Sequence, residues 1–415
     1  MPDLPYDIIV LIVRFLAVGK WLIRYPVARY STINHLWNEA IEREWTFKEI
    51  LVRSSAINSI TIARLGRVLQ RDGGRRRKYV RHIIFTPESV NRLMSAKTRS
   101  ANERTADDVV FSRDIAELWG ILADWSPESK FKLSISLHGR GRANWPDSNG
   151  FLNYIGDSLP LLSNVHSFET GLHVRIWPPS VVQFLNSLPA VKTADIEIGD
   201  VCASRWARES NVTEIDEVLA TSIRQIPPGC TNVQLNLGHS PHGRPGVSDA
   251  FLCAGLTALS PQLRKLYLTG SAVTPAVLDA VASMPWPHLQ EVKFDFDAVR
   301  KVTGRADAAF VNALYVATAS VVRSMPALLE LMLCSSCILK EGNAPDLNVK
   351  RDEKTNKWKV EWGVSRAPFR DLDDKVTEAW GIKKPADKIQ WRRDEEQPED
   401  ETPSWYAEEL LPWKY

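Results

Sequence analysis

The chain has 415 residues, of which 44% are hydrophobic and 25% charged, and its formal net charge at pH 7 is +2. These fractions are near those of ordinary globular proteins, which excludes wholesale disorder and collagen-like structure. The small net charge provides no general attraction to nucleic acids or anionic lipids. At roughly 150 residues per domain, the length predicts two or three domains, or one small domain joined to a repeat array.

Cysteine usage and the first residues indicate the compartment. Five cysteines are an odd number and too sparse for a disulfide scaffold, so we expect a reducing environment. Asp3 and Asp7 precede the first apolar run and Arg14 interrupts it, which is unlike a signal peptide or a membrane span of about 20 residues. We therefore expect a cytoplasmic or nuclear protein that does not enter a membrane.

The first fifty residues predict three short helices. Apolar residues recur at helical spacing from Leu4 to Leu16, a second helical run follows Gly19, and a third begins near Ser31. Helices this short cannot bury all of their apolar side chains among themselves. Either the rest of the chain or a partner must cover them.

The order of these residues resembles an F-box, as found in proteins of filamentous fungi. Leu4-Pro5-Tyr6-Asp7-Ile8, with Ile12 and Leu16 after it, is similar to the opening Leu-Pro-x-Glu-Ile-x-x-x-Ile-x-x-x-Leu of that family. Tyr30-Ser31-Thr32-Ile33, with Trp37, is similar to its second half, Tyr-Ala-x-Val-x-x-x-Trp. Asp7 and Ile33 depart from the motif conservatively, and the middle stretch lacks the family's frequent Asp-Leu pair. An ordinary amphipathic helical cap is the alternative interpretation.

The resemblance implies a binding function. F-box domains dock on the Skp-family linker of SCF ubiquitin ligases, which contain a cullin, and apolar anchors dominate such an interface. The residues of this chain that we expect to contact the linker are Leu4, Pro5, Ile8, Ile12, Leu16, Ile33 and Trp37.

Four consecutive basic residues, Arg75 to Lys78, precede a predicted strand at Tyr79–Phe85. They are either a localisation signal or nucleic-acid patch, or a solvated lead-in to the strand. The lead-in is favoured because no basic surface interleaved with aromatic residues accompanies the run. Binding to nucleic acid is therefore not the expected function.

One pattern recurs about eight times between residues 55 and 340. A helical run ends in an apolar residue plus proline, as in Ser324-Met325-Pro326, and a short strand such as Leu331-Met332-Leu333 follows. Several strands have the spacing Leu-x-x-Leu-x-Leu, although the repeats are longer and less regular than the roughly 20–29 residues of leucine-rich repeats. The predicted fold is α/β: a three-helix F-box over residues 1–54, then an irregular leucine-rich-repeat-like solenoid with a parallel sheet over residues 55–340.

A doubly wound α/β enzyme is the competing fold, since it also alternates strands and helices. Such a fold usually has a glycine-rich phosphate turn after a strand, and the sequence has none. It also lacks the common hydrolase, zinc-protease and Walker motifs, and Cys334-Ser-Ser-Cys337 has no second cysteine pair nearby. We therefore expect no enzyme activity, no catalytic residue, no metal and no cofactor.

In a repeat array, the side chains between the inward apolar positions project from the concave sheet face. They mix charges, amides and an aromatic ring, which suits a protein partner; a solvated face without a ligand is the alternative. The candidate target-binding residues are Gln234, Asn236, Tyr267, Thr269, Lys293, Asp295 and Glu330.

Beyond the repeats, residues 341–392 predict a capping hairpin and a short helix near Asp374–Trp380. Residues 393–415 predict an acidic linker and a Trp-rich tail, which either folds back on the array or serves as a docking peptide. Taken together, the sequence predicts a substrate-recognition adaptor of an SCF-type ubiquitin ligase. The alternative is an interaction scaffold outside a ligase, and the sequence does not identify the target in either case.

Overall fold

A computed structural model of the chain describes residues 4–18, 30–54, 60–87, 101–136, 151–171, 176–197, 212–237, 249–270, 273–296, 308–335, 345–352, 358–364 and 374–381. The helical run expected after Gly19, the residue Cys337, and the linker and tail at 393–415 lie outside these ranges.

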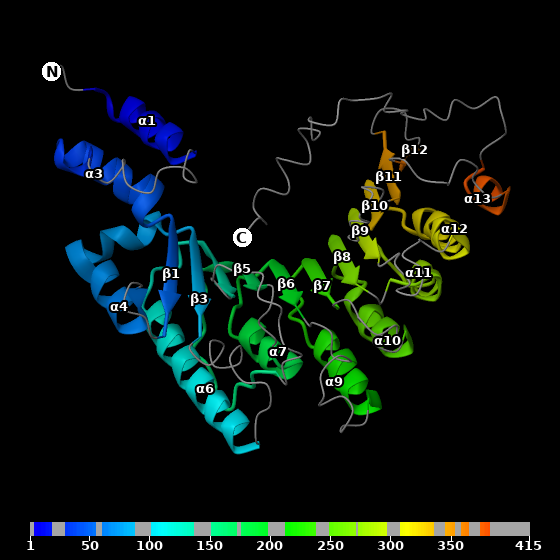
Figure 1. Cartoon of the computed structure of the whole chain (residues 1–415), viewed down its shortest axis with the longest axis horizontal. Helices are drawn as coiled ribbons and strands as arrows, with labels where there is room; N and C mark the ends of the chain where they lie inside the picture. The colour runs from blue at the N-terminus through cyan, green and yellow to red at the C-terminus, as the bar shows by residue number, and fades with distance from the viewer. Residues whose placement is uncertain are drawn as a thin grey trace. The chain divides into compact units, whose positions relative to one another are not determined.

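The described residues form a mixed α/β fold in which most strands are parallel, as the sequence predicts (Figure 1). The chain divides into two compact units. The first comprises Met1–His138 and Ser148–Glu197, and the second comprises Gly139–Asp147 and Ile198–Tyr415.

The first unit begins with helices and continues with strands that alternate with helices. Its helical elements are α1 (Tyr6–Val18), η1 (Tyr30–Thr32), α3 (His35–Ile41), η2 (Glu42–Thr46), α4 (Ile62–Gln70), η3 (Arg71–Tyr79), α6 (Ala101–Ala123) and α7 (Pro178–Asn186). Its strands are β1 (Glu49–Arg53), β2 (Ile60–Thr61), β3 (His82–Thr86), β4 (Phe131–Ile135), β5 (Val165–Thr170) and β6 (Thr193–Glu197).

The strands of the first unit are parallel and lie in the order β6-β5-β4-β3-β1-β2. From β3 to β6, neighbours in the sheet are thus also neighbours along the chain. Strand β1 is not expected from the sequence, which places residues 49–53 in the helical module. It pairs with β3 so that Ile50 lies opposite Ile83.

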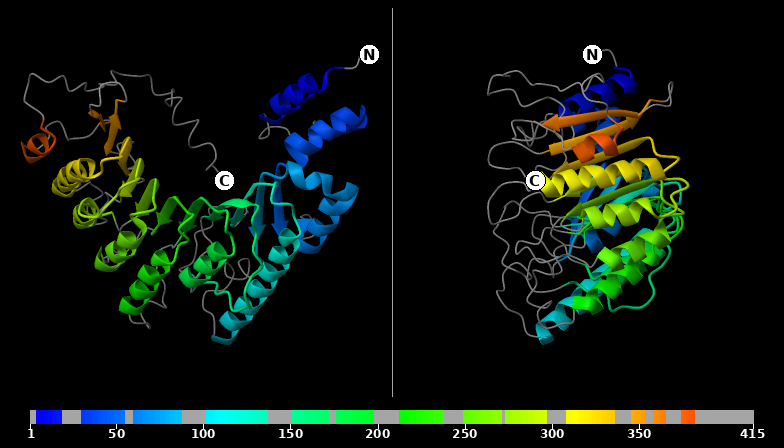
Figure 2. Two further views of the ribbon diagram at one scale, coloured as in Figure 1. Left: turned by 180° about the vertical axis from the view of Figure 1, so that it is seen from behind. Right: turned by 90° about the vertical axis from the view of Figure 1, so that its right-hand side faces the viewer.

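Alternation of side chains gives this sheet one apolar and one polar face. On the apolar face, Ile83, Leu133 and Phe168 are fully buried. Helices α4, α6 and α7 lie on one side of the strands (Figures 1 and 2). The Phe184 ring of α7 lies 5.5 Å from that of Trp119 in α6 and 6.2 Å from that of Phe168, so the core of the unit lies between helices and sheet.

The strand predicted at Tyr79–Phe85 begins later than expected. The basic run belongs to the 3₁₀ helix η3, which ends at Tyr79, and β3 begins at His82. Gly73 and Gly74 have φ angles of 64° and 81°, a backbone conformation that glycine adopts without steric cost. The sequence pattern does not predict this element because its arginine side chains are held by residues far away in the chain.

The second unit repeats the same alternation. Its helices are α9 (Val212–Arg224), α10 (Asp249–Leu259), α11 (Pro275–Ala282), α12 (Ala308–Ser324) and α13 (Asp374–Ala379). Its strands are β7 (Asn232–Asn236), β8 (Lys265–Gly270), β9 (Glu291–Phe296), β10 (Glu330–Ser335), β11 (Pro345–Arg351) and β12 (Trp358–Val364).

Strands β7 to β10 are parallel and lie in chain order, with α9 to α12 on one side of them (Figures 1 and 2). Strands β11 and β12 then add to β10 as an antiparallel pair, at the position of the expected hairpin. Local signals set the helix ends: Thr274 Oγ1 accepts a 3.2 Å hydrogen bond from Val277 N, and Pro275 follows the cap. No helix within the described ranges is both long and apolar enough to span a bilayer.

Candidate functional site

The N-terminal helices bury one side of α1 and leave the other exposed. Ile9, Val10 and Val13 of α1 are buried together with Ala40 and Ile41 of α3. Helix α3 begins at a sequence-encoded cap, since Asn34 Oδ1 accepts hydrogen bonds from Leu36 N (3.0 Å) and Trp37 N (3.1 Å). The two helices therefore share a small core that does not include the opposite face of α1.

The exposed face of α1 and the chain around it carry large apolar side chains. Their exposed fractions are 44% for Leu4, 42% for Ile8, 57% for Leu11, 80% for Phe15 and 54% for Ile33. We call these five residues the apolar face. A cluster of exposed apolar side chains is typical of a surface that binds a partner.

Of the seven residues expected to contact a linker, Leu4, Pro5, Ile8 and Ile33 are exposed. Ile12 and Trp37 are half-buried, and Trp37 packs against the core shared by α1 and α3. The side chain of Leu16 lies outside the part of the structure that is described.

Leu11 and Phe15 belong to the apolar face although the resemblance did not single them out. Both are more exposed than Ile8. The signal was present in the sequence, since positions 8, 11 and 15 are related by the steps of three and four residues that place side chains on one side of a helix.

A bidentate ion pair between Arg14 and Glu44 holds α1 against η2. Arg14 donates to Glu44 through Nε (2.9 Å) and Nη2 (3.1 Å), and the Glu44 side chain is almost fully buried. The hydrogen bond from Arg14 is the main cause that holds the pKa of Glu44 below its usual value, against the effect of burial. The orientation of α1, and with it the apolar face, is thereby fixed.

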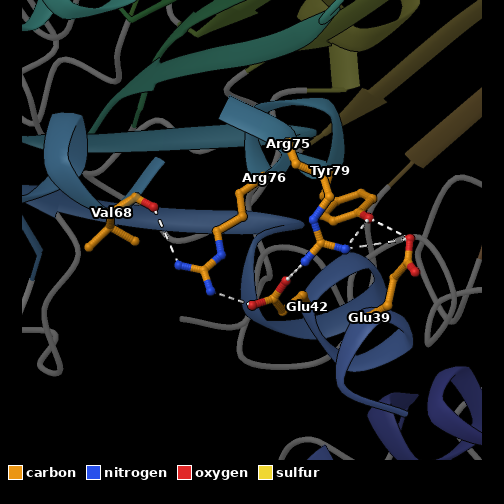
Figure 3. A network of polar contacts seen from close by, with 6 residues as sticks. All are labelled: Glu39, Glu42, Val68, Arg75, Arg76 and Tyr79. Carbon is orange, nitrogen blue, oxygen red and sulfur yellow. Dashed lines mark hydrogen bonds and ion pairs between the residues drawn. The ribbon is translucent and has the colours of Figure 1, made fainter. Parts of the chain in front are cut away.

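A second network joins the helical module to the sheet through η3 (Figure 3). The buried carboxylate of Glu42 accepts hydrogen bonds from Arg75 Nη2 (3.0 Å) and Arg76 Nη2 (2.6 Å). Tyr79 donates from its hydroxyl to Glu39 Oε1 at 2.7 Å. Burial, followed by the hydrogen bond to Glu39, raises the pKa of Tyr79 to about 12.

Other contacts of the basic run are also internal. Arg77 donates to the Asp124 carbonyl at 3.0 Å, and the Arg76 guanidinium lies 5.1 Å from the centre of the Phe47 ring. These contacts give Arg75, Arg76 and Arg77 a structural role that neither interpretation of the run anticipated.

The polar sheet face of the first unit carries a ladder of hydrogen bonds across four adjacent strands. Glu49 Oε2 of β1 lies 3.3 Å from His82 Nδ1 of β3, whose Nε2 lies 2.7 Å from Ser134 Oγ of β4. Ser134 donates to Glu169 Oε2 of β5 at 2.8 Å. Lys132 forms an ion pair with the same oxygen of Glu169.

The contacts from Glu49 to His82 to Ser134 resemble the carboxylate–imidazole–hydroxyl catalytic triad of a hydrolase. The hydroxyl proton of Ser134, however, is directed to Glu169 rather than to the imidazole, and Ser134 is only 2% exposed. A nucleophile must transfer its proton to the base and reach the substrate. The ladder therefore serves as a fixed polar surface and not as a nucleophilic site.

The expected target-binding residues of the second unit lie on the polar face of its sheet. Gln234, Tyr267 and Lys293 are register partners on β7, β8 and β9, as are Asn236, Thr269 and Asp295. Lys293 Nζ lies 5.9 Å from the centre of the Tyr267 ring, and Lys350 Nζ lies 3.0 Å from Glu330 Oε1. The charges of this face are thus largely paired within it.

Within the described ranges, no three His, Cys, Asp or Glu side chains gather in a way that could hold a metal ion. A scan against protein-family models and a search of the curated proteins found no match for the chain. The two kinds of surface described above, one apolar and one polar, are therefore the basis for assigning a function.

Proposed function

We propose that the protein is a substrate-recognition adaptor of an SCF-type ubiquitin ligase. The N-terminal helices bind the Skp-family linker, and through it the cullin, by way of Leu4, Pro5, Ile8, Ile12, Leu16, Ile33 and Trp37. The polar face of the strand–helix array binds the target protein. The observation that carries the proposal is the apolar face, which lies on a well-defined helical core and is left uncovered among the described residues.

The energetics favour a partner for this face. Covering a side chain such as Leu, Ile or Phe gains about 1.5–3 kcal/mol over leaving it in water. Ile8, Leu11 and Phe15 follow one another along α1, so one groove of a partner can cover all three. Because the sequence motif resembles an F-box, we infer that this partner is a Skp-family linker.

The arrangement of strands and helices supports a leucine-rich-repeat-like solenoid as the second part of the proposal. Within each unit, strands β3 to β6 and β7 to β10 follow chain order, and the helices lie on one side of them. A doubly wound enzyme has helices on both faces and a reversal of strand order where it binds its ligand. The one-sided arrangement leaves the polar face open to a protein, as repeat proteins use it.

Such an adaptor makes and breaks no bond itself. It holds the target near the conjugating enzyme of the ligase, so that a bimolecular step becomes an effectively intramolecular one. The proposal therefore includes no catalytic residue, no cofactor and no metal.

The test is binding of the full-length protein to a purified Skp-family linker. Ile8→Asp places a charge in the centre of the apolar face and is expected to weaken binding at least tenfold, because buried anchors dominate such interfaces. Trp37→Ala is expected to weaken it as well. Val109→Asp changes an exposed apolar residue of α6 away from this face and is the matched control.

Binding that is lost in Ile8→Asp and kept in Val109→Asp supports the adaptor. No binding of the wild-type chain, or equal binding of both variants, contradicts it. If the linker binds but no cullin is recovered, and target half-lives are unchanged by deleting the protein, the scaffold outside a ligase replaces the adaptor.

A further inference from the structure

Strand β12 lies at the edge of the sheet in the second unit (Figure 1). It pairs with β11 on one side, and no described strand pairs with it on the other side. Its 7 residues make it longer than the average strand of about 5–6 residues. An edge of this kind presents a row of backbone N–H and C=O groups that can pair with a strand of another molecule.

The ladder on the inner side of β12 shows which of its backbone groups point outward. Arg351 N of β11 donates to Leu329 O at 2.8 Å, directly before β10, so the backbone groups of Arg351 point away from β12. Because these directions alternate along a strand, the backbone groups of Lys350 and of its register partner Lys359 point to each other. The N–H and C=O of the next residue, Val360, therefore point to the open edge.

The charges near this edge favour an anion on its outer side. Lys359 is exposed, and its register partner on β11 is a second cation, Lys350. Lys350 Nζ in turn lies 3.0 Å from Glu330 Oε1 of β10. Like charges directly opposite each other on adjacent strands are destabilising, whereas opposite charges stabilise the pair. A strand added to β12 is therefore favoured if it brings a carboxylate opposite Lys359.

We propose that β12 pairs with β12 of a second copy of the chain, in an antiparallel register centred on Val360. This register places Lys359 opposite Glu361 of the second copy, and by two-fold symmetry it does so twice. It also places Trp358 opposite Trp362 of the second copy. The outward backbone groups of Val360 meet those of the same residue in the other copy, as an antiparallel ladder requires.

The order of residues in β12 selects both this occupant and this register. A register centred on Glu361 would bring two carboxylates together, and one centred on Lys359 would bring two ammonium groups together. Only the register centred on Val360 makes the strand complementary to itself in charge. The two-fold axis also covers both open edges at once, so that the assembly closes as a dimer. The inference is independent of the proposed function, since it involves neither the apolar face nor a linker.

The experiment measures the mass of the full-length protein by sedimentation velocity at increasing concentration and low salt. Lys359→Glu places carboxylates opposite each other on both sides of the axis, and Glu361→Lys does the same with ammonium groups. Each variant is expected to raise the Kd of the dimer at least about tenfold. Lys130→Glu makes the same change of charge at an exposed position of the first unit and is the matched control, expected to dimerise as the wild type does.

A mixture of the two single variants tests the register itself. In the mixed dimer, every carboxylate again lies opposite an ammonium group, so Lys359→Glu and Glu361→Lys should dimerise together although neither does so alone. Val360→Pro removes an outward N–H and leaves the ladder to β11 intact, a change that an edge strand tolerates. It should keep the circular dichroism spectrum of the wild type and weaken dimerisation.

A dimer that is weakened by Lys359→Glu, kept by Lys130→Glu and formed again in the mixture supports the inference. A wild-type chain that stays monomeric at every concentration overturns it. Equal weakening by Lys359→Glu and Lys130→Glu would reduce the effect to net charge and overturns it as well. A mixture that stays monomeric, or a folded Val360→Pro variant that dimerises as the wild type does, shows that the copies do not meet through β12.

Discussion

Arg76 Nη2 lies 2.6 Å from Glu42 Oε1, although 34 positions separate the two residues in the chain. The contact joins η3, which leads into the sheet, to η2, which belongs to the N-terminal helices (Figure 3). The proposed adaptor would work by orientation, so a rigid connection between the N-terminal helices and the sheet of the first unit would be of direct use to it. Glu42 supplies that connection within the first unit.

We expect Glu42→Gln to destabilise the first unit by about 2 kcal/mol, because it leaves two partly buried guanidinium groups without their carboxylate. Urea unfolding followed by circular dichroism measures the change. Glu49→Gln alters an exposed carboxylate that lies 3.3 Å from His82 Nδ1 and is the control, expected to stay within about 0.5 kcal/mol. Similar losses in the two variants would remove the special role of Glu42.

The basic run is expected not to bind nucleic acid, since Arg75 and Arg76 are held by Glu42 and Arg77 by a backbone carbonyl. Electrophoretic mobility of a random-sequence DNA duplex should be unchanged by the protein at about 100 mM salt. Retention of the duplex that weakens steeply as salt rises is the signature of phosphate contacts. Its loss on changing Lys78 to Gln would show that the run also serves as a nucleic-acid patch.

The variant Phe15→Asp tests whether the linker contacts residues of α1 other than those of the F-box-like motif. Its side chain is exposed, so Phe15→Asp should leave the thermal unfolding midpoint within about 2 °C of wild type. Affinity for the Skp-family linker is expected to fall at least tenfold, because the change puts a charge into the interface. Unchanged affinity confines the interface to the motif residues.

Asp195 predicts a pH dependence of stability. Its pKa is about 7 in the folded chain and 3.8 in the reference state, so between these values the folded chain binds more protons than the unfolded one. The free energy of unfolding therefore falls as pH rises through that window. We expect Asp195→Asn to abolish the decrease in the free energy of unfolding that the titration of Asp195 causes. This decrease is on the order of 2 kcal/mol between pH 5 and pH 8.

The measurement compares urea unfolding of wild type and Asp195→Asn at the two pH values, so that titration of all other groups cancels. The stability of the variant relative to wild type should rise from pH 5 to pH 8, by on the order of 2 kcal/mol. The same change with pH in both proteins contradicts the assigned cause.

The alternation of helices and strands was determined by the sequence. Apolar periodicity and proline placement are local signals, so they predicted the strand at β10 and the hairpin of β11 and β12. Strand β1 was missed because five residues directly after a helical run carry too short a pattern to separate strand from helix.

The tertiary structure alone decided which polar residues meet. The partners of Arg75 and Arg76 lie more than thirty positions away, so the sequence showed only a run of positive charge. The ladder from Glu49 to Glu169, and Asp195 beside it, depends on the register of five strands, and a shift of one residue would turn each side chain to the other face. Local patterns specify elements; long-range pairing, which is set by packing of the whole unit, brings the side chains of a site together.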